Sequence, residues 1–434
     1  MKKNGFTLVE ITVCVVLLVT IFLIVVPKVN TMINNKKKNA YNSLISTVKD
    51  AAQAYVYLNV NIVDDAIESQ GYYEVSIRTL QENELLENKL ENPLTGKNIP
   101  STSIVKIIKN NEEYIYKFSL DYQYLLEHII DLYSSEETRI SNGLKKDNTP
   151  DQNIRYYGSD PNNYVSFNNE LWRIIGVFGD NVKLVRKDSL GELSWDSSES
   201  SVNNGWGVNE WSQSALKNYL NTMYYGGTSV TCYNGQNKKE VTCPTGIIDE
   251  TAKTLIDNYT WNTGAITWND ATIVNQEAGE LKTIPFYNAE RGSVNGKICT
   301  GGSICNDTVE RTTTWTGYVG LPYVTDWAYA SSESVCETNM WDGDIDTTHG
   351  RFNMTCKNNN WMHRSNNTWY LSPCTYSFSD GASHVWNVGN MGYVSFGSAA
   401  YTYAVVPSIY LKSNVLIESG AGTSSDPYIL KAGA

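Results

Sequence analysis

Three carboxylates at alternate positions form the clearest chemical motif of this chain. Asp342, Asp344 and Asp346 follow Trp341 with the spacing of the first ligands in a calcium-binding loop. Such a loop also needs a glycine after the third acid and a glutamate at its twelfth position, which is Asn353 here. Two interpretations are therefore open: a solvated acidic loop, which is the simpler one, and a calcium site.

The eight cysteines are concentrated late in the chain, and seven of them lie beyond residue 230. Such clustering is typical of disulfides formed in oxidising surroundings. Pairs close in sequence give the simplest connectivity. The expected disulfides are Cys232–Cys243, Cys299–Cys305 and Cys336–Cys356. Cys374 is left over, and the sequence allows it to replace a partner or to pair between subunits.

Other kinds of chemical site have less support in the spacing of residues. Cys356 with His349 and His363 is a conceivable metal cluster, but the ligand spacing of known zinc sites is missing. The chain also lacks a phosphate-binding glycine loop, a nucleophile elbow and a histidine–carboxylate spacing. The sequence predicts that the protein is not an enzyme and that it has no cofactor. Calcium is the one bound ion that the sequence leaves open.

A single carboxylate interrupts a long apolar segment near the N-terminus. Residues 6–26 are apolar except for Glu10 and three threonines. As a helix this segment would be about 30 Å long, enough to cross a bilayer. A charged side chain near the centre of such a helix costs roughly 2.5–3.5 kcal/mol, which indicates a function for Glu10. The segment predicts a single-pass protein of the cytoplasmic membrane.

The residues around Glu10 resemble the N-terminal signal of type IV prepilins and pseudopilins. The resemblance implies that a prepilin peptidase cuts between Gly5 and Phe6 and that Phe6 is then N-methylated. It also implies that Glu10 pairs with the Phe6 amine of a neighbouring subunit and sets the filament register. Pro27 lies where many pilins have a helix-kinking proline. A plain membrane anchor is the alternative, but it does not explain Glu10 or the Gly5-Phe6 junction.

The elements that follow predict a small globular part. Apolar residues recur at helical spacing up to Tyr55, and two apolar runs over 104–108 and 114–118 predict a hairpin. The order of these elements resembles small pseudopilins. The expected divisions are a leader (1–5), a transmembrane and stalk helix (6–58), a pilin-like globular part (59–120), and a helix with linker (121–152).

Residues 153–434 differ in composition, since all twelve tryptophans lie beyond residue 171. A helix is expected over 211–223, with short strands and loops elsewhere. Segments 153–158, 163–178, 325–330, 405–412 and 419–423 resemble a module of Firmicutes surface proteins that has no settled activity. Its layout is similar to the C-type-lectin-like fold shared with formylglycine-generating enzymes. The resemblance implies an extracellular display domain.

Two specific properties of those relatives have weak support in this region. Trp268-Asn269-Asp270 matches the calcium-binding triplet of sugar-binding C-type lectins, but it lies in the middle of the domain. A formylglycine-generating oxidase would need a close pair of reactive cysteines, and Cys336, Cys356 and Cys374 are widely spaced. The chain as a whole predicts an α+β fold, in which a long N-terminal pilin-type helix with a small antiparallel sheet precedes a larger, loop-rich α+β domain.

Charge narrows the choice of partners. Residues 1–58 hold seven lysines against Glu10 and Asp50, a net charge of +5, so the remainder of a chain with net charge −12 carries −17. An acidic domain repels phosphate backbones, and no nucleic acid is expected as a partner. Abundant tyrosine, tryptophan and asparagine suit a surface glycan or a protein.

These features together predict a minor pilin or pseudopilin-like subunit of a type IV pilus or type II secretion-like filament, with a large extracellular domain on display. The expected partners are the prepilin peptidase, other pilin subunits and the inner-membrane assembly platform. The alternative is a surface adhesin or lectin-like protein that uses the pilin segment only for export and anchoring. A tethered enzyme of the formylglycine-generating type is a third option.

Overall fold

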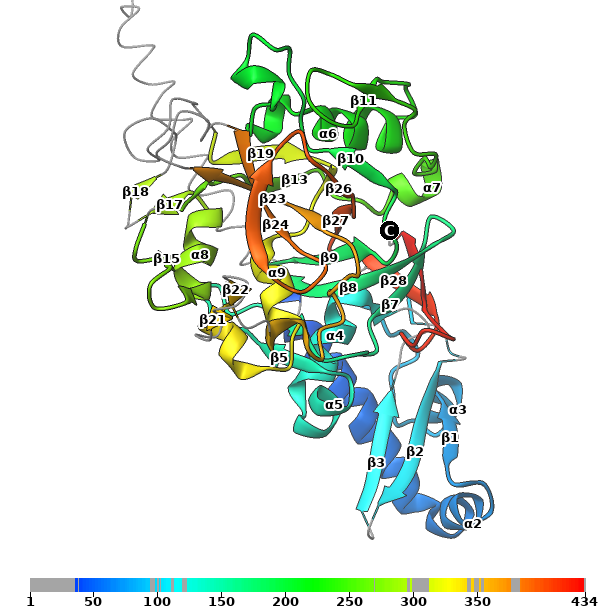
Figure 1. Cartoon of the computed structure of the whole chain (residues 1–434). Helices are drawn as coiled ribbons and strands as arrows, with labels where there is room; N and C mark the ends of the chain where they lie inside the picture. Colours follow the sequence, from blue (N-terminus) through cyan, green and yellow to red (C-terminus); the bar gives the residue numbers. More distant parts are fainter. Residues whose placement is uncertain are drawn as a thin grey trace, which may run out of the picture. The chain divides into compact units, whose positions relative to one another are not determined.

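The computed structural model describes residues 36–432 except 38, 94–97, 100, 102, 111–112, 119–122, 269, 295–296, 299–311, 342–344, 347–350, 353–354 and 376–382. The chain divides into two compact units (Figure 1). Unit 1 ends at Gln123, and unit 2 begins at Tyr124.

Unit 1 combines helices with one antiparallel sheet. A helical run over 39–58 is followed by α2 (Val60–Gln70), β1 (Tyr73–Ser76), α3 (Ile77–Glu82), β2 (Ile104–Asn110) and β3 (Glu113–Phe118). The sheet order is β1-β2-β3. Val105 pairs with Val75 on one side and with Phe118 on the other. The hairpin expected over 104–118 is thus confirmed.

The core of unit 1 follows from the apolar stripe of the helical run. Val48, Ala51, Ala52, Tyr55 and Val56 are buried at a spacing of three to four residues, which places them on one helix face. They share one core with the buried side chains of the sheet. In Figure 1 the run lies along one face of β1, β2 and β3.

The predicted N-terminal helix over 6–58 is contradicted. The first continuous helical run of the described residues begins at 39, and residues 1–35 lie outside them. The run has one apolar face and polar residues elsewhere, because it packs on a sheet. The predicted single-pass membrane protein is contradicted as well. None of the helices in the part of the chain that the structure describes combines the length and the apolar character needed to cross a membrane.

Two sheets dominate unit 2. The ten-stranded sheet has the order β20-β27-β9-β8-β7-β29-β28-β4, with β6 beside β8 and β5 beside β6. Its strands are β4 (Gln123–Tyr124), β5 (Leu144–Lys146), β6 (Ile154–Tyr156), β7 (Tyr164–Phe167), β8 (Glu170–Phe178), β9 (Asn181–Arg186), β20 (Val319–Gly320), β27 (Ser408–Leu411), β28 (Val415–Ser419) and β29 (Tyr428–Ala432).

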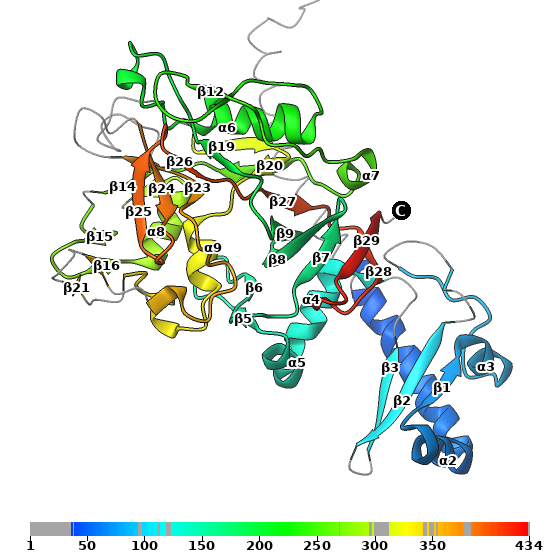
Figure 2. The same cartoon turned by 45° about the vertical axis from the view of Figure 1, so that its right-hand side comes forward.

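The six-stranded sheet has the order β10-β26-β23-β24-β25, and β14 pairs with β23 (Figure 2). Its strands are β10 (Glu192–Ser194), β14 (Ile266–Thr267), β23 (Thr368–Thr375), β24 (His384–Val388), β25 (Val394–Ser398) and β26 (Thr402–Ala404). Five two-stranded pairs surround the two sheets: β11 (Cys232–Tyr233) with β12 (Glu240–Val241), β13 (Tyr259–Asn262) with β19 (Thr314–Gly317), β15 (Val274–Asn275) with β16 (Glu280–Leu281), β17 (Ser293–Val294) with β18 (Lys297–Ile298), and β21 (Ile345–Asp346) with β22 (Arg351–Phe352).

The helices described in unit 2 are short. They are α4 (Leu125–Ser134), α5 (Glu136–Ser141), α6 (Ala215–Asn218), α7 (Glu250–Lys253), α8 (Thr283–Glu290) and α9 (Val324–Tyr329), with the 3-10 turns η1 (Asn203–Gly205), η2 (Trp211–Gln213), η4 (Ser334–Glu337) and η5 (Thr355–Lys357) and the π-helix η3 (Tyr219–Tyr225). The helix expected over 211–223 is divided at Ser214, whose side chain caps α6 by accepting a hydrogen bond from Lys217 N.

The predicted α+β class is therefore contradicted, because the described chain is mostly sheet and has several sheets with short helices. The sequence of β8 shows the physical reason. Residues Trp172–Phe178 are all buried and all apolar except Arg173, so this strand lacks the alternation of apolar and polar residues that marks a half-buried strand. One core joins the two large sheets and includes Trp172 of β8, Trp369 of β23 and Trp386 of β24.

Candidate functional site

Most of the predicted N-terminal and calcium-site residues lie outside the described residues. This applies to Gly5, Phe6, Glu10 and Pro27, and to Cys299, Cys305, Asp342 and Asp344. Asp346 belongs to β21, which pairs with β22. Over the described ranges, no group of three or more His, Cys, Asp or Glu side chains could hold a metal ion.

Two of the expected disulfides are confirmed. Cys232 of β11 bonds to Cys243, and Cys336 of η4 bonds to Cys356 of η5, with Cα–Cα distances of 5.2 and 5.6 Å. Cys374 is buried in β23.

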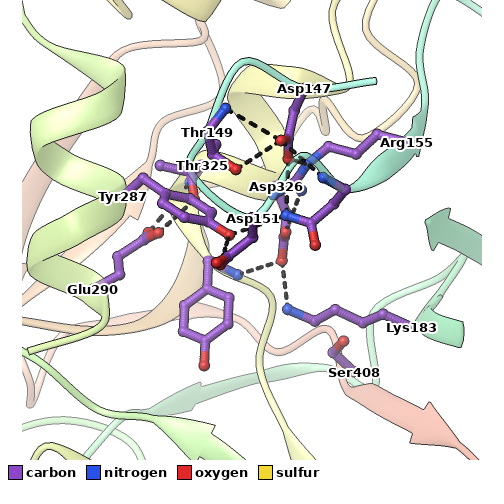
Figure 3. Close-up of polar contacts among 12 residues, drawn as sticks. Asp147, Thr149, Asp151, Arg155, Lys183, Tyr287, Glu290, Thr325, Asp326 and Ser408 are labelled. Carbon is purple, nitrogen blue, oxygen red and sulfur yellow. Dashed lines mark hydrogen bonds and ion pairs between the residues drawn. The ribbon is translucent and has the colours of Figure 1, made fainter. Parts of the chain in front are cut away.

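The densest set of charges in the described chain is a buried group in unit 2 that the sequence did not predict as a site. We call Asp147, Arg155, Lys183, Glu290 and Asp326 the charged cluster (Figure 3). Arg155 Nε donates to Asp147 at 2.6 Å, and Arg155 Nη1 donates to Asp326 at 2.7 Å. Lys183 Nζ donates to the second oxygen of Asp326 at 2.6 Å. All four of these side chains are at most 1% exposed.

Asp147 is positioned by the loop between β5 and β6. Its Oδ1 accepts hydrogen bonds from Thr149 Oγ1 at 2.7 Å and from Asn153 N at 3.0 Å. Its Oδ2 accepts from Asn153 Nδ2 and from Arg155. A short polar loop thereby closes around one carboxylate, which fixes where β6 begins and directs Arg155 into the interior.

Asp326 is positioned by the start of α9. It is the third residue of that helix, and its Oδ2 accepts a hydrogen bond from Tyr323 N at 2.9 Å, as in a capping box. The same oxygen accepts the bond from Lys183, which projects from β9. The ammonium group of Lys183 also lies 4.1 Å from the ring centre of Tyr323, a favourable cation–π arrangement.

Glu290 ends α8 and bonds to the same helix start. It accepts hydrogen bonds from the hydroxyl and from the backbone N–H of Thr325, and its side chain is fully buried. Burial raises the pKa of Glu290 to about 7, although Arg291 and the hydrogen bonds from Thr325 act in the opposite direction. The geometry thus favours a neutral Glu290 near or below pH 7.

In the other residues of the charged cluster, the pairing of opposite charges acts against the effect of burial on the pKa. Burial acts to raise the pKa of Asp326, but Lys183 and Arg155 outweigh it and hold that pKa below its usual value. The pKa of Asp147 is lowered in the same way by Arg155. Burial lowers the pKa of Lys183 to about 8, and Asp326 opposes this shift.

The chemistry of the charged cluster is structural. Asp147, Arg155, Lys183 and Asp326 pair with one another and are almost completely buried, although Arg155 Nη2 has no hydrogen-bond partner among the described residues. The cluster ties together the β5–β6 loop, β9, α8 and α9, which are distant in sequence. The sequence contained one indication of this cluster, because segments 153–158 and 325–330 place Arg155 and Asp326 among apolar neighbours. Only the fold shows that these two residues meet.

A polar cavity of about 510 Å³ opens elsewhere in unit 2. Its wall includes Asp196, Glu199, Gln213, Lys217, Tyr233 and Lys238. Burial raises the pKa of Asp196 to about 6, against hydrogen bonds from the backbone N–H groups of Val208 and Ala215. Since both Asp196 oxygens accept backbone bonds, this carboxylate holds the loop after β10 in place.

Comparison with known proteins does not assign the chain to a family. No protein-family model matches it, and searches of curated proteins and of solved structures found no match.

Proposed function

We propose that this chain is a minor subunit of a pilin-like filament, in which unit 1 serves assembly and unit 2 is a displayed recognition domain. The observation that carries this proposal is an exposed apolar surface on unit 1. Tyr57, Leu58, Val60 and Ile62 are 83%, 66%, 40% and 59% exposed. We call these four residues the assembly patch.

The assembly patch lies at the junction between two helices. The helical run over 39–58 meets α2 at Asn59, whose side chain donates to Tyr55 O at 2.9 Å and whose backbone N–H donates to Val56 O at 3.0 Å. Tyr55 and Val56 are themselves core residues of unit 1. Apolar side chains that follow one another on a fixed surface mark a site of association.

Unit 2 supports the second half of the proposal. Four of its buried charged side chains pair with one another, and two disulfides cross-link its chain, with Cys232, Cys336 and Cys356 buried. A rigid domain of this kind suits recognition. The Gly5-Phe6 junction and Glu10 support filament assembly through their resemblance to prepilins.

Replacing Ile62 by Ser tests the assembly role. A buried isoleucine contributes about 1.5–3 kcal/mol, so its loss from an interface should weaken association at least about ten-fold. The expected result is a strong reduction of filaments counted by electron microscopy in cells that produce the variant. The matched control is Ile247→Ser, because Ile247 is 53% exposed but belongs to unit 2.

Equal filament numbers for Ile62→Ser and Ile247→Ser would contradict the assembly role. Normal filaments after complete deletion of the protein, together with lost binding of cells to a ligand, would instead favour the adhesin.

A further inference from the structure

Three aromatic side chains meet at the surface of unit 2. The rings of Trp206 and Tyr401 are 5.6 Å apart and perpendicular, and those of Tyr401 and Tyr403 are 6.0 Å apart. Tyr401 is 45% exposed, and the other two are partly exposed. We call these three residues the aromatic corner. We propose that it binds a neutral oligosaccharide, an inference that rests on the proposed role of unit 2 in recognition.

The aromatic corner is held in place before any ligand arrives. Trp206 O accepts hydrogen bonds from Ala400 N at 3.1 Å and from Ser398 Oγ at 3.0 Å, which joins the two segments that carry the rings. Tyr403 packs on the fully buried Trp369, with ring centres 4.5 Å apart. Preorganised rings bind without a large loss of side-chain entropy.

A glycine beneath the rings supports this arrangement. A Cβ atom at Gly397 would lie 2.8 Å from a ring carbon of Tyr401 and 3.2 Å from the Tyr403 hydroxyl. Both distances are shorter than ordinary contacts, so a side chain at position 397 would displace the rings. The close approach of Tyr401 to the strand β25 therefore depends on Gly397.

Ring geometry and neighbouring groups point to a sugar. The C–H face of a pyranose is weakly positive and stacks on the negative face of an aromatic ring, and a perpendicular pair offers a face and an edge. The neighbouring segments carry amide side chains: Thr402 Oγ1 donates to Asn234 Oδ1 at 2.5 Å, and Asn204 and Asn237 are exposed. Amides can donate and accept hydrogen bonds, as sugar hydroxyls require.

The loop that carries Trp206 also contributes to the wall of the polar cavity. Val202, in its wall, belongs to the same loop as Trp206, and Tyr233 directly precedes Asn234. The loop over 233–238 is fixed to that segment, since Asn237 N donates to Gly205 O at 3.2 Å. An oligosaccharide of several units could therefore contact the corner with one unit and the cavity with others.

Charge and area favour a neutral glycan over other ligands. The chain beyond residue 58 carries a net charge of −17, which disfavours sulfated or acidic sugars. A protein partner needs an interface of about 1,000 Å² or more with an apolar centre. The corner instead offers three rings, two of them half-buried, within a polar surround.

The test is calorimetric titration of the purified full chain with cellohexaose, maltohexaose and N,N′-diacetylated chitohexaose as separate probes. At least one probe should bind. Tyr401→Ala and Trp206→Ala should each weaken that binding at least ten-fold, and Gly397→Ala should weaken it although all three rings remain. Tyr401→Phe should keep it, because stacking requires the ring alone.

Tyr72→Ala is the matched control, since it removes a partly exposed tyrosine from unit 1 that belongs to neither proposed surface, and it should leave sugar binding unchanged. Unchanged thermal unfolding of the variants shows that the fold is intact. Failure of all three probes would overturn the inference, as would binding that Tyr401→Ala does not weaken. A partner that stays bound to the corner after removal of its glycans would also overturn it. None of these results depends on whether Ile62→Ser loses filaments.

Discussion

Asp326→Asn should destabilise unit 2 by about 3–5 kcal/mol, because it leaves two buried cations without a full counter-charge. Asp326 accepts hydrogen bonds from Arg155, Lys183 and Tyr323 N. Asparagine at position 326 keeps one acceptor oxygen. Its NH₂ group takes the place of the other oxygen and, as a donor, would face the donor group of either Arg155 or Lys183. The substitution would thus loosen the packing of α9 against β6 and β9.

Urea unfolding followed by tryptophan fluorescence measures this effect. All twelve tryptophans lie beyond residue 171, so the signal reports unit 2 and not unit 1. The control is Glu250→Gln, which breaks the exposed Glu250–Lys253 pair and should change stability by less than about 1 kcal/mol. A loss below about 1 kcal/mol for Asp326→Asn would contradict the structural role of the charged cluster.

A second large effect is expected for Glu290→Gln, and it depends on pH. The pKa of Glu290 is raised to about 7 in the folded protein, from an ordinary value of 4.5. Below pH 4.5 the side chain is protonated in both states. Between pH 4.5 and 7 the unfolded chain loses this proton while the folded chain keeps it, so stability falls as pH rises.

Glutamine is neutral at every pH and can still bond to Thr325. The variant should match the parent in stability near pH 4 and exceed it by about 3 kcal/mol at pH 8, since each pKa unit is worth about 1.4 kcal/mol. Urea unfolding at a series of pH values gives this difference, and Glu250→Gln again serves as the surface control. A stability difference that is the same at pH 4 and pH 8 would contradict the raised pKa of Glu290, because it would show that folding does not shift the ionisation of this side chain.

Local patterns in the sequence predicted local structure in unit 1. The apolar stripe through Val48 and Tyr55 has a helical period, and it packs as that period requires. The hairpin over 104–118 could be predicted because its two runs are separated by a short polar connection. The prediction of one long helix over 6–58 was wrong, because the apolar segment over 6–26 was taken to continue into the helix that carries Val48 and Tyr55.

Unit 2 could not be predicted in the same way because its pairings are distant in sequence. Val319 of β20 pairs with Ile409, and Tyr428 of β29 lies parallel to Val165. Strands of two to five residues carry too little periodicity to show such partners. The fold class was wrong for this reason, whereas Cys232–Cys243 and Cys336–Cys356 could be predicted from nearness alone.

The same limit explains the charged cluster and the aromatic corner. Asp147 and Asp326 meet at Arg155 although 171 residues separate Arg155 from Asp326. Trp206 and Tyr401 meet through their ring contact and through hydrogen bonds between segments that are distant in sequence. Composition predicted that aromatic and amide side chains would be abundant, and the fold determines which of them are buried and which reach the surface.

The most direct test of the filament proposal is the intact mass and N-terminal residue of the protein purified from its native cells. The account predicts a chain that begins at Phe6 with a methylated amine and lacks the five residues before it. A chain that still begins at Met1, or that has been cut beyond Val26, would contradict it.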